Sequence, residues 1–401
     1  MKLSVIIVSY QVRHYLSLCL DSLKRALQGV EAEVIVVDNH SGDDTVDYLR
    51  KNYSWVRLIA NNHNLGFARA NNIAIRQAKG EFVLLLNPDT VVAETTIVEC
   101  LQFMENHTDA GALGVCMLNR DGTFAKESRR SVPTPMTAFY KMSGLCSLYP
   151  ESRRYGRYYM GWLPWDRSAP IQITSGAFSM FRLSKLQEMR GFDEDYFMYG
   201  EDIDLSYRLM LDGCTNYYLP ATILHYKGES THKSSFRYVH VFYEAMLIFL
   251  KKHFGNLSIL LALPVKIAIY VKALGALMSM SLHSLRKMLG FPISRKQLAV
   301  GYVCVGSQQM LDCCRKKLDE RALDGLYIKG DGSTLPKGHT GIMEQIISEY
   351  GSKEVVVVYD TNTYTYQQVL SIFAGDPHSN ITIAFYCENS DVIVTGNEVI
   401  Q

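Results

Sequence analysis

The N-terminal part of the chain alternates short β-branched runs with longer stretches in which apolar residues recur every three to four positions. This pattern predicts an α/β domain with parallel strands, and the runs lack alternating polarity, as in strands buried on both faces. Ser41 or Asp43 is the expected N-cap of the second helix. We expect strands over 3–8, 34–37, 56–60, 82–86 and 112–118, and helices over 12–27, 43–51, 67–78 and 93–106.

The pattern is lost after residue 126. From 126 to 167, prolines mix with many Arg, Tyr and Trp residues and no regular period holds, which predicts a long functional connection. Regular structure is expected again near Ile171, with helices over 201–212 and 235–254.

An apolar stretch over 257–289 raises the question of a membrane. Lys266 and Lys272 in its middle argue against a simple transmembrane span. No Asp or Glu occurs from 245 to 311, whereas eight Lys or Arg do, so the rest of a chain of net charge +1 is acidic. We expect helices that lie in the interface of an anionic membrane; a pair of core helices that bridges two domains is the alternative.

A second α/β unit follows Pro292. A strand is expected over 298–305 and a helix from Gln308, with further elements at 354–359, 366–373, 381–386 and 391–394. Gly306 is the only glycine of a dinucleotide fingerprint at the first turn, which favours a structural or partner-binding role. The expected division is therefore a first domain over 1–255, an amphipathic helical linker over 256–292 and a Rossmann-like domain over 293–401.

Composition narrows the class of protein. With 401 residues, 48% of them hydrophobic and 20% charged, the chain falls outside the disordered class. Nine cysteines, an odd number without a C-x-x-C pair, do not form the pattern of a disulfide framework or a zinc site, so a reducing, cytoplasmic compartment is expected. The first ten residues are too short in apolar length for a secretory signal and are expected to form a strand.

Polar side chains follow several of the predicted strands. Ser9 and Tyr10 follow the first strand, and Asp38, Asn39 and Asp43 follow the second. Open α/β sheets bind ligands at this edge, where an aromatic ring could lie on a base and the polar groups could bond a pyrimidine and a ribose. The same residue types are also ordinary turn and capping residues.

Two acidic segments carry more information. Asp89 follows Asn87 and Pro88 on a rigid turn after a buried strand, where it could hold a divalent cation or cap the next helix. Glu201, Asp202 and Asp204 crowd the first turn of a predicted helix. One acid would be enough to interact favourably with the helix dipole. The presence of three therefore favours a general base next to an acid with a structural role.

These segments, in this order and spacing, resemble the family 2 glycosyltransferases of the GT-A fold over residues 1 to about 250. A further family segment matches residues 64–72, from Asn64 and Gly66 to Arg69 and beyond. Asn87 stands where many relatives have the first Asp of a D-x-D triplet, so one carboxylate must do more of the metal binding, and Gln11 replaces a frequent Asn.

The resemblance implies a role for each matching residue. Asp202 would be the catalytic base with Glu201 beside it, and Asp89 would bind Mg²⁺ or Mn²⁺. His225 would be a metal or phosphate ligand, although a lone His after a strand is more often structural. The nucleotide-sugar site would comprise Ser9, Tyr10, Asp38, Asn39, Asp43, Asn64, Gly66, Arg69 and Asn87.

Within the family, four segments look most like those of bacterial rhamnosyltransferases: 87–90, 128–130, 144–145 and 149–150. The unit over 293–401 is similar to Rossmann-like extensions of some members. The resemblance implies an inverting enzyme that transfers a sugar, with rhamnose favoured, from a UDP- or dTDP-sugar to a lipid-linked or polysaccharide acceptor in cell-surface glycan synthesis.

That enzyme would work in the cytoplasm, peripheral to the inner face of the membrane, with no nucleic acid among its partners. Two other functions are the alternatives. A nucleotidyltransferase would need a basic, glycine-rich loop after the first strand, and none is present. A non-catalytic membrane scaffold would have no reason to keep Asp89, Glu201 and Asp202.

Overall fold

The computed structural model describes residues 1–227, 236–255, 300–330, 348–349 and 354–401. The first part of the chain contains the strands β1 (Leu3–Ser9), β2 (Ala32–Asp38), β3 (Arg57–Ala60), β4 (Phe82–Leu86), β5 (Thr90–Val92), β6 (Ala110–Leu118), β7 (Ala169–Ile171), β8 (Phe178–Arg182) and β9 (Thr215–His225). Its helices are α1 (Arg13–Ala26), α2 (Thr45–Asn52), α3 (Phe67–Ile75), α4 (Thr96–Asn106), α5 (Pro135–Met142), α6 (Leu145–Leu148), α7 (Leu183–Glu188), α8 (Glu201–Leu211) and α9 (Phe236–Phe254), with short 3₁₀ turns η1 (Lys126–Ser128) and η2 (Gly156–Tyr159).

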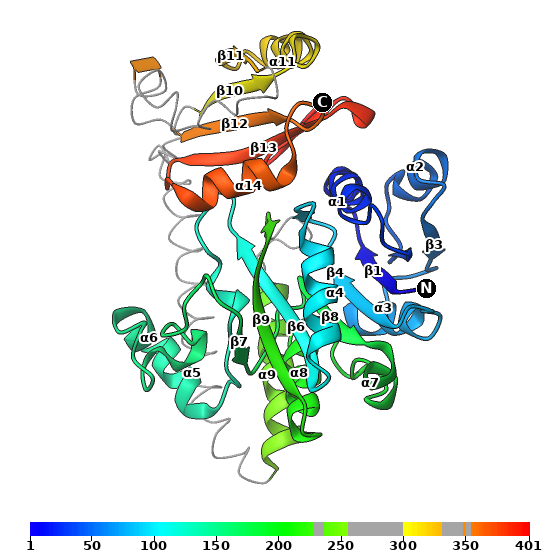
Figure 1. Ribbon diagram of the computed structural model, residues 1–401, viewed down its shortest axis with the longest axis vertical. Coiled ribbons are helices and arrows are strands. Elements are labelled where there is room, and N and C mark those ends of the chain that lie inside the picture. The colour runs from blue at the N-terminus through cyan, green and yellow to red at the C-terminus, as the bar shows by residue number, and fades with distance from the viewer. Residues whose placement is uncertain (228–235, 256–299, 331–347, 350–353) are drawn as a thin grey trace, which may run out of the picture.

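These strands form a single twisted sheet in the order β3-β2-β1-β4-β8-β6-β9-β5, and β7 pairs with the outer part of β9 (Figure 1). The expected strands at 3–8, 34–37, 56–60, 82–86 and 112–118 are confirmed within a few residues. The expectation of parallel strands is confirmed for β1 to β4, and β6 and β9 are parallel to each other. The sheet also contains antiparallel strands that the sequence pattern did not predict. β8 runs antiparallel to both β4 and β6, and β5 and β7 run antiparallel to β9.

Two local expectations also need correction. The connection over 126–167 contains α5 and α6, because Thr134 caps a helix that opens on Pro135. The second helix begins at Thr45, and its N-cap is Asp44, whose side chain makes no capping hydrogen bond. Asp43 lies one residue earlier, and its carboxylate accepts the Thr45 backbone N–H at 3.1 Å.

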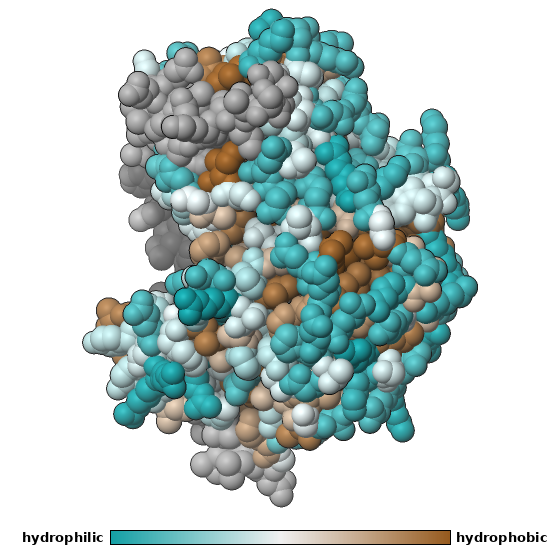
Figure 2. Space-filling view, in the orientation of Figure 1, coloured by the Kyte–Doolittle hydropathy of each residue, from teal (hydrophilic) through white to brown (hydrophobic). Residues whose placement is uncertain are grey.

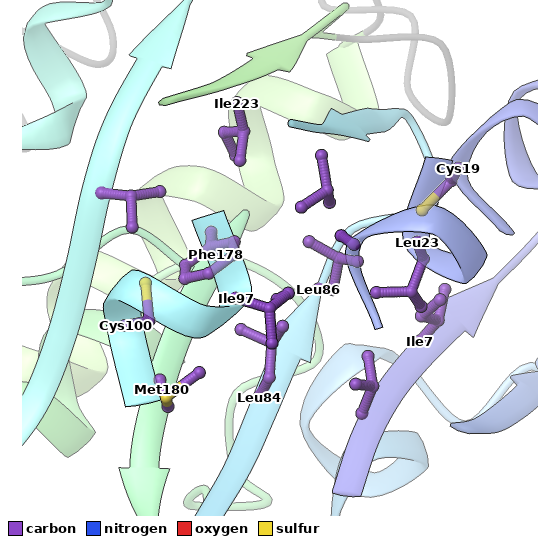
Figure 3. Close-up of a cluster of buried hydrophobic side chains, with 14 of the residues drawn as sticks. Ile7, Cys19, Leu23, Leu84, Leu86, Ile97, Cys100, Phe178, Met180 and Ile223 are labelled. Atoms are coloured by element: carbon purple, nitrogen blue, oxygen red, sulfur yellow. The ribbon is translucent and has the colours of Figure 1, made fainter. Parts of the chain in front are cut away.

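The first sheet is buried on both faces, as the apolar strands predict. On one face Ile7 of β1 and Leu84 and Leu86 of β4 pack against α1 and α4 (Figure 3). On the other face Ile6 and Val8 pack with side chains from α3, α7 and α8. Because successive strand residues point to opposite faces, β1, β2, β4, β6 and β8 contribute to both cores, which holds their ends in a fixed position.

The second sheet has the order β11-β10-β12-β13-β14-β15. Its elements are β10 (Val300–Gly306), α11 (Gln308–Glu320), β11 (Gly325–Lys329), β12 (Glu354–Asp360), α14 (Tyr366–Gly375), β13 (Ile381–Cys387), β14 (Val392–Val394) and β15 (Val399–Ile400). At the start of α11 the Asp360 carboxylate accepts the backbone N–H and the hydroxyl of Ser307, at 3.1 and 2.6 Å. A Cβ on Gly306 would lie 2.3 Å from the Asp360 Cβ. A carboxylate therefore already occupies the helix N-terminus at which the first turn of such a fold binds anions.

The two sheets pack against each other through buried contacts. The Tyr15 hydroxyl donates to the Thr395 carbonyl at 2.9 Å, and the Ile383 backbone N–H donates to the Arg120 carbonyl at 2.8 Å. The Glu94 carboxylate accepts the first two backbone N–H groups of α14, at 3.0 and 2.7 Å. One hydrophobic cluster contains side chains from both units. The second unit is therefore docked on the first one.

The expected amphipathic segment at 256–292 lies outside the described residues. Across the portions of the chain that the structure covers, no helix combines the length and apolarity needed to cross a membrane. All nine cysteines fall within the described residues, and each is a free thiol, as the cysteine pattern predicts.

Candidate active site

A cavity of about 650 Å³ opens at the C-terminal edge of the first sheet. One wall, which we call the donor wall, comes from the segments that follow β1, β2 and β4 and from the loop before α3. Another part of the lining, which we call the acceptor wall, comes from the connection over 126–160 and from α9. The N-terminus of α8 also lines the cavity. The residues that line the cavity include Tyr10, Asn39, Asn64, Gly66, Asn87 and Asp89 on the donor wall, Glu201 and Asp202 on α8, and Arg130, Lys141, Met142, Phe249 and Leu250 on the acceptor wall.

Hydrogen bonds fix the donor wall. The Asn39 side-chain amide donates to Asn64 Oδ1 at 2.9 Å, and Asn39 Oδ1 accepts the Leu65 backbone N–H at 3.0 Å. Gly66 has a φ of +81°, and a Cβ there would lie 2.5 Å from the Phe197 carbonyl oxygen. Only glycine allows this close approach, which seats the start of α3 against the loop that precedes α8.

Five predicted donor residues therefore line the cavity: Tyr10, Asn39, Asn64, Gly66 and Asn87. Four others do not line it. Ser9 and Asp38 are buried behind it, where Asp38 Oδ2 accepts the Ser41 backbone N–H at 3.0 Å. Arg69 is exposed, 3.7 Å from Glu194. Asp43 lies beside a separate surface hollow.

Asp89 and His225 come together because of strand register. β5 pairs with β9 so that Thr90 lies opposite His225. This pairing places His225 Nε2 3.3 Å from Asp89 Oδ1, with both side chains largely buried. Among the described residues, His225 Nδ1 has no hydrogen-bond partner. Two residues that are 136 positions apart in the sequence thus form one polar pair at the cavity.

Glu201 and Asp202 stand in different environments at the start of α8. Asp202 Oδ2 accepts Arg130 Nη2 at 2.5 Å and the Gly176 backbone N–H at 3.1 Å. Glu201 is 6% exposed, and its Oε2 has no hydrogen-bond partner within the described parts of the chain. Burial, together with the nearby negative charge of Asp202, raises the pKa of Glu201 to about 8. The pair therefore consists of a carboxylate held by a cation and a carboxyl group that keeps its proton at neutral pH.

The third acid of this turn has a structural role. Asp204 is fully buried, and its carboxylate contacts Arg208 of α8 at 2.7 Å and Lys252 and His253 of α9 at 2.9 and 2.7 Å. Burial alone would raise the pKa of Asp204, but these three partners outweigh it and lower the pKa to about 2. Asp204 therefore fixes α8 to α9 and does not line the cavity.

Several residues that line the cavity have no role predicted from the sequence. Arg130 and its neighbour Arg129 differ in role, because Arg129 turns away from the cavity, donates to the Pro164 carbonyl at 3.0 Å and stacks on Trp165. Lys227 lines the cavity and pairs with Glu127 at 3.0 Å. The only signal in the sequence was the density of basic and aromatic residues in a segment without periodicity.

Comparison with known proteins places this architecture in a family. The model of the family described as glycosyl transferase family 2 matches residues 4–189. An N-acetylglucosaminyl-diphospho-decaprenol L-rhamnosyltransferase of Mycobacterium tuberculosis is 30% identical over 267 residues, which cover 63% of this chain and 85% of that protein. The rhamnosyltransferase WbbL of Escherichia coli is 25% identical over 55% of this chain and 88% of its own length.

Solved structures are more distant. The mannosyltransferase PcManGT of Pyrobaculum calidifontis, in complex with GDP-Man and Mn²⁺, is 17% identical, with a TM-score of 0.43 over 73% of this chain and 81% of that one.

The chain belongs to glycosyltransferase family 2, and it is a hexosyltransferase. Its described residues form a mixed α/β sheet domain and a second sheet domain. Its relatives are rhamnosyltransferases and other glycosyltransferases of glycan synthesis. The family assignment displaces both the nucleotidyltransferase and the non-catalytic scaffold as functions of this chain.

Proposed function

We propose that this chain is an inverting glycosyltransferase that transfers a sugar, with rhamnose favoured, from a UDP- or dTDP-sugar to a hydroxyl of a lipid-linked saccharide. The observation that carries this proposal is the lining of one cavity, which brings together the polar pair Asp89–His225 and the carboxyl groups of Glu201 and Asp202 at the start of α8. An inverting transfer requires charge stabilisation on the side of the leaving group and a base on the opposite side.

Asp89 and His225 are a chemically suitable pair for Mg²⁺ or Mn²⁺. A buried carboxylate oxygen and an imidazole nitrogen lie 3.3 Å apart, close enough to share one cation after a small separation. Within the described residues, no group of three or more His, Cys, Asp or Glu side chains is placed to hold a metal, so the donor diphosphate and water would complete the coordination. When bound, the cation would neutralise the charge of the departing diphosphate.

Asp202 is the proposed base. Arg130 and the Gly176 amide hold one oxygen of the Asp202 side chain, so the orientation of this carboxyl group is fixed. Glu201 keeps its proton beside it, and the different environments of the two carboxyl groups assign them different roles. The acceptor hydroxyl gives its proton to Asp202 while its oxygen bonds to the anomeric carbon. The bond from that carbon to the diphosphate oxygen breaks, and a nucleoside diphosphate leaves.

Tyr10, Asn39, Asn64, Gly66 and Asn87 are the proposed contacts to the nucleotide sugar, because they line the donor wall. Four other predicted residues would affect donor binding indirectly, by positioning the donor-wall residues, or would reach the donor after a rearrangement of the loops. They are Ser9, Asp38, Asp43 and Arg69. Asp38 is the most direct case, because it is the last residue of β2, immediately before Asn39, and anchors the turn at Ser41.

The acceptor and the location of the enzyme follow from the same proposal. The Mycobacterium tuberculosis relative is named for an acceptor linked to decaprenol through a diphosphate. A comparable acceptor would place this enzyme at the inner face of the cytoplasmic membrane. We propose the divisions 1–255, 256–292 and 293–401, with the basic, apolar sequence 256–292 at the membrane interface.

A panel of nucleotide sugars tests the proposal. We expect release of a nucleoside diphosphate from one UDP- or dTDP-sugar, dependent on Mn²⁺ or Mg²⁺ and abolished by chelation. Turnover in excess chelator would return Asp89 and His225 to a structural pair. No turnover of any UDP- or dTDP-sugar, with a lipid-linked acceptor present, would contradict the assigned donor class.

A further inference from the structure

Large apolar side chains are exposed together on α5, α6 and the residue after α6. Met136 and Phe139 are each 57% exposed, and Leu148 is 68% exposed. Met142 and Tyr149 are 46% and 51% exposed, so five of the eleven exposed large hydrophobic residues in the described chain fall within fourteen consecutive residues. We call these five residues the α5–α6 apolar patch. Soluble proteins normally expose such side chains singly, and a cluster marks an interaction surface.

The faces of α5 show that this exposure is not a by-product of core packing. Thr137 and Tyr140 form the buried face, and Pro135, Ala138 and Met142 line the cavity. Met136 and Phe139 point outward on the remaining face. A helix at an ordinary protein surface presents polar residues there. The outward face of α5 is instead suited to an apolar environment.

The charges around the patch identify that environment. Lys141, Arg153, Arg154 and Arg157 are exposed on the unit formed by α5, α6 and η2, and Glu151 is the only acid from 128 to 165. Arg154 Nε donates to the Tyr140 hydroxyl at 3.3 Å, and Lys141 Nζ lies 3.9 Å from the centre of the Tyr158 ring. Apolar anchors beside cations and tyrosines are the composition that lies in the headgroup region of an anionic bilayer.

The position of the patch connects it to the cavity. In Figure 1, α5 and α6 form a projection at the left of the view, away from the sheet. Figure 2 shows apolar and strongly polar atoms side by side on this projection. The same helix that exposes Met136 and Phe139 places Ala138 in the acceptor wall, where Phe249 and Leu250 of α9 continue the apolar lining. Met142 belongs both to the patch and to the lining of the cavity.

We propose that the α5–α6 apolar patch and its flanking cations form a docking surface for an anionic phospholipid bilayer, which places the acceptor wall of the cavity at the level of the headgroups. This inference rests on the proposed function, because the acceptor of that function is carried by a lipid in the same bilayer. It concerns residues of α5, α6 and η2 and makes no use of the sequence at 256–292.

Cosedimentation of the full chain with vesicles tests the docking surface. The vesicles contain phosphatidylcholine alone or phosphatidylcholine with phosphatidylglycerol. Replacing Phe139→Ser together with Leu148→Ser should weaken binding to the anionic vesicles by about tenfold or more, since both side chains lose their apolar burial. The matched control is Leu211→Ser, which removes a side chain that is 66% exposed at the end of α8 and should leave binding unchanged.

A second set of variants tests the charges. Arg153→Gln, Arg154→Gln and Arg157→Gln together should weaken binding to anionic vesicles and reduce its sensitivity to salt. Binding by the patch variants equal to that of the wild type, with the same thermal unfolding, would overturn the proposal. A change in the sedimentation of the protein without lipid, with vesicle binding unaltered, would identify the patch as a contact between copies and would also overturn it.

Failure of the proposed function would give a different result. Vesicle binding requires neither donor nor metal. If only the proposed transferase function is wrong, the patch variant should still bind anionic vesicles more weakly than the Leu211→Ser control does. If both proposals hold, the patch variant should transfer sugar normally to a water-soluble, short-chain acceptor and should lose transfer to an acceptor embedded in vesicles.

Discussion

The two walls of the cavity differ in how they are built. The donor wall consists of short segments that follow buried strands, and hydrogen bonds such as that from Asn39 to Asn64 hold it in place. The acceptor wall comes from helices beside the sheet, and side chains such as Ala138, Met142 and Phe249 give it an apolar surface. A fixed polar wall suits a small, charged donor, and an apolar wall suits a larger, amphiphilic acceptor. The start of α8 belongs to neither wall and provides further carboxyl groups of the lining.

The largest expected effect comes from removing the proposed base. Asp202→Asn should lower turnover by about a hundredfold or more, because a positioned base contributes at least that much, and it should leave donor binding largely intact. Asp212→Asn, at the C-terminal end of the same helix, is the control. Steady-state kinetics and donor titration measure both. Near-normal turnover in the Asp202 variant would remove this residue from the mechanism.

Substitution of Asp204 tests how much its ion pairs, which fix α8 to α9, stabilise the fold. Asp204→Asn leaves Arg208, Lys252 and His253 without their shared carboxylate and should lower the free energy of unfolding by about 3 kcal/mol. Because the pKa of Asp204 is lowered in the folded state, its contribution is present at neutral pH and is lost as the pH falls toward about 2. Denaturant titrations at pH 7 and at low pH check this difference; equal stability of variant and wild type at pH 7 would show that the cluster is not stabilising.

Asp89 tests the donor wall alone. Asp89→Ala should weaken metal and donor binding by about tenfold or more, because only His225 would remain of the proposed pair. Its affinity for the acceptor should not change. Calorimetry with the metal and then with the donor separates the two effects. Weakened acceptor binding with unchanged donor binding would reverse our assignment of the walls.

Glu201 provides the smallest and most specific effect. Its pKa is raised, so the protonated form is present at neutral pH and is lost as the pH rises through about 8. If that form serves the reaction, the rate should decline at alkaline pH, and Glu201→Gln should abolish the decline because the amide cannot ionise. At high pH the Glu201→Gln variant should also be more stable than the wild type, since the amide forms no charge in the buried site. An unchanged alkaline limb would assign the decline to another group.

The sequence predicted the donor wall better than the acceptor wall, for a physical reason. Asn39 and Asn87 directly follow strands that are evident from local hydrophobicity, and the sheet brings such positions to one edge. The contact of Asp89 with His225 depends on the pairing of the three-residue strand β5 with β9, and local pattern does not predict pairing over that distance. His225 was predicted from the family resemblance alone.

The contact of Asp202 with Arg130 could not be predicted from the sequence, because it also joins residues that are far apart in the chain. Arg130 and Arg129 are adjacent in a segment without periodicity, and only the fold shows that Arg130 meets Asp202 whereas Arg129 stacks on Trp165. The second unit was predicted in outline, since β10, α11 and β12 follow clear patterns. Its docking on the first unit involves contacts such as Tyr15 with Thr395, which no local pattern encodes.

The central claim is a single displacement across the cavity, with Asp202 taking the acceptor proton on the side opposite the diphosphate. The configuration at the anomeric carbon of the product, determined by NMR after transfer from the donor identified in the panel, tests it most directly. We predict that the configuration of the donor is inverted. A product with the donor's configuration retained would contradict the single displacement and the role of Asp202 as its base.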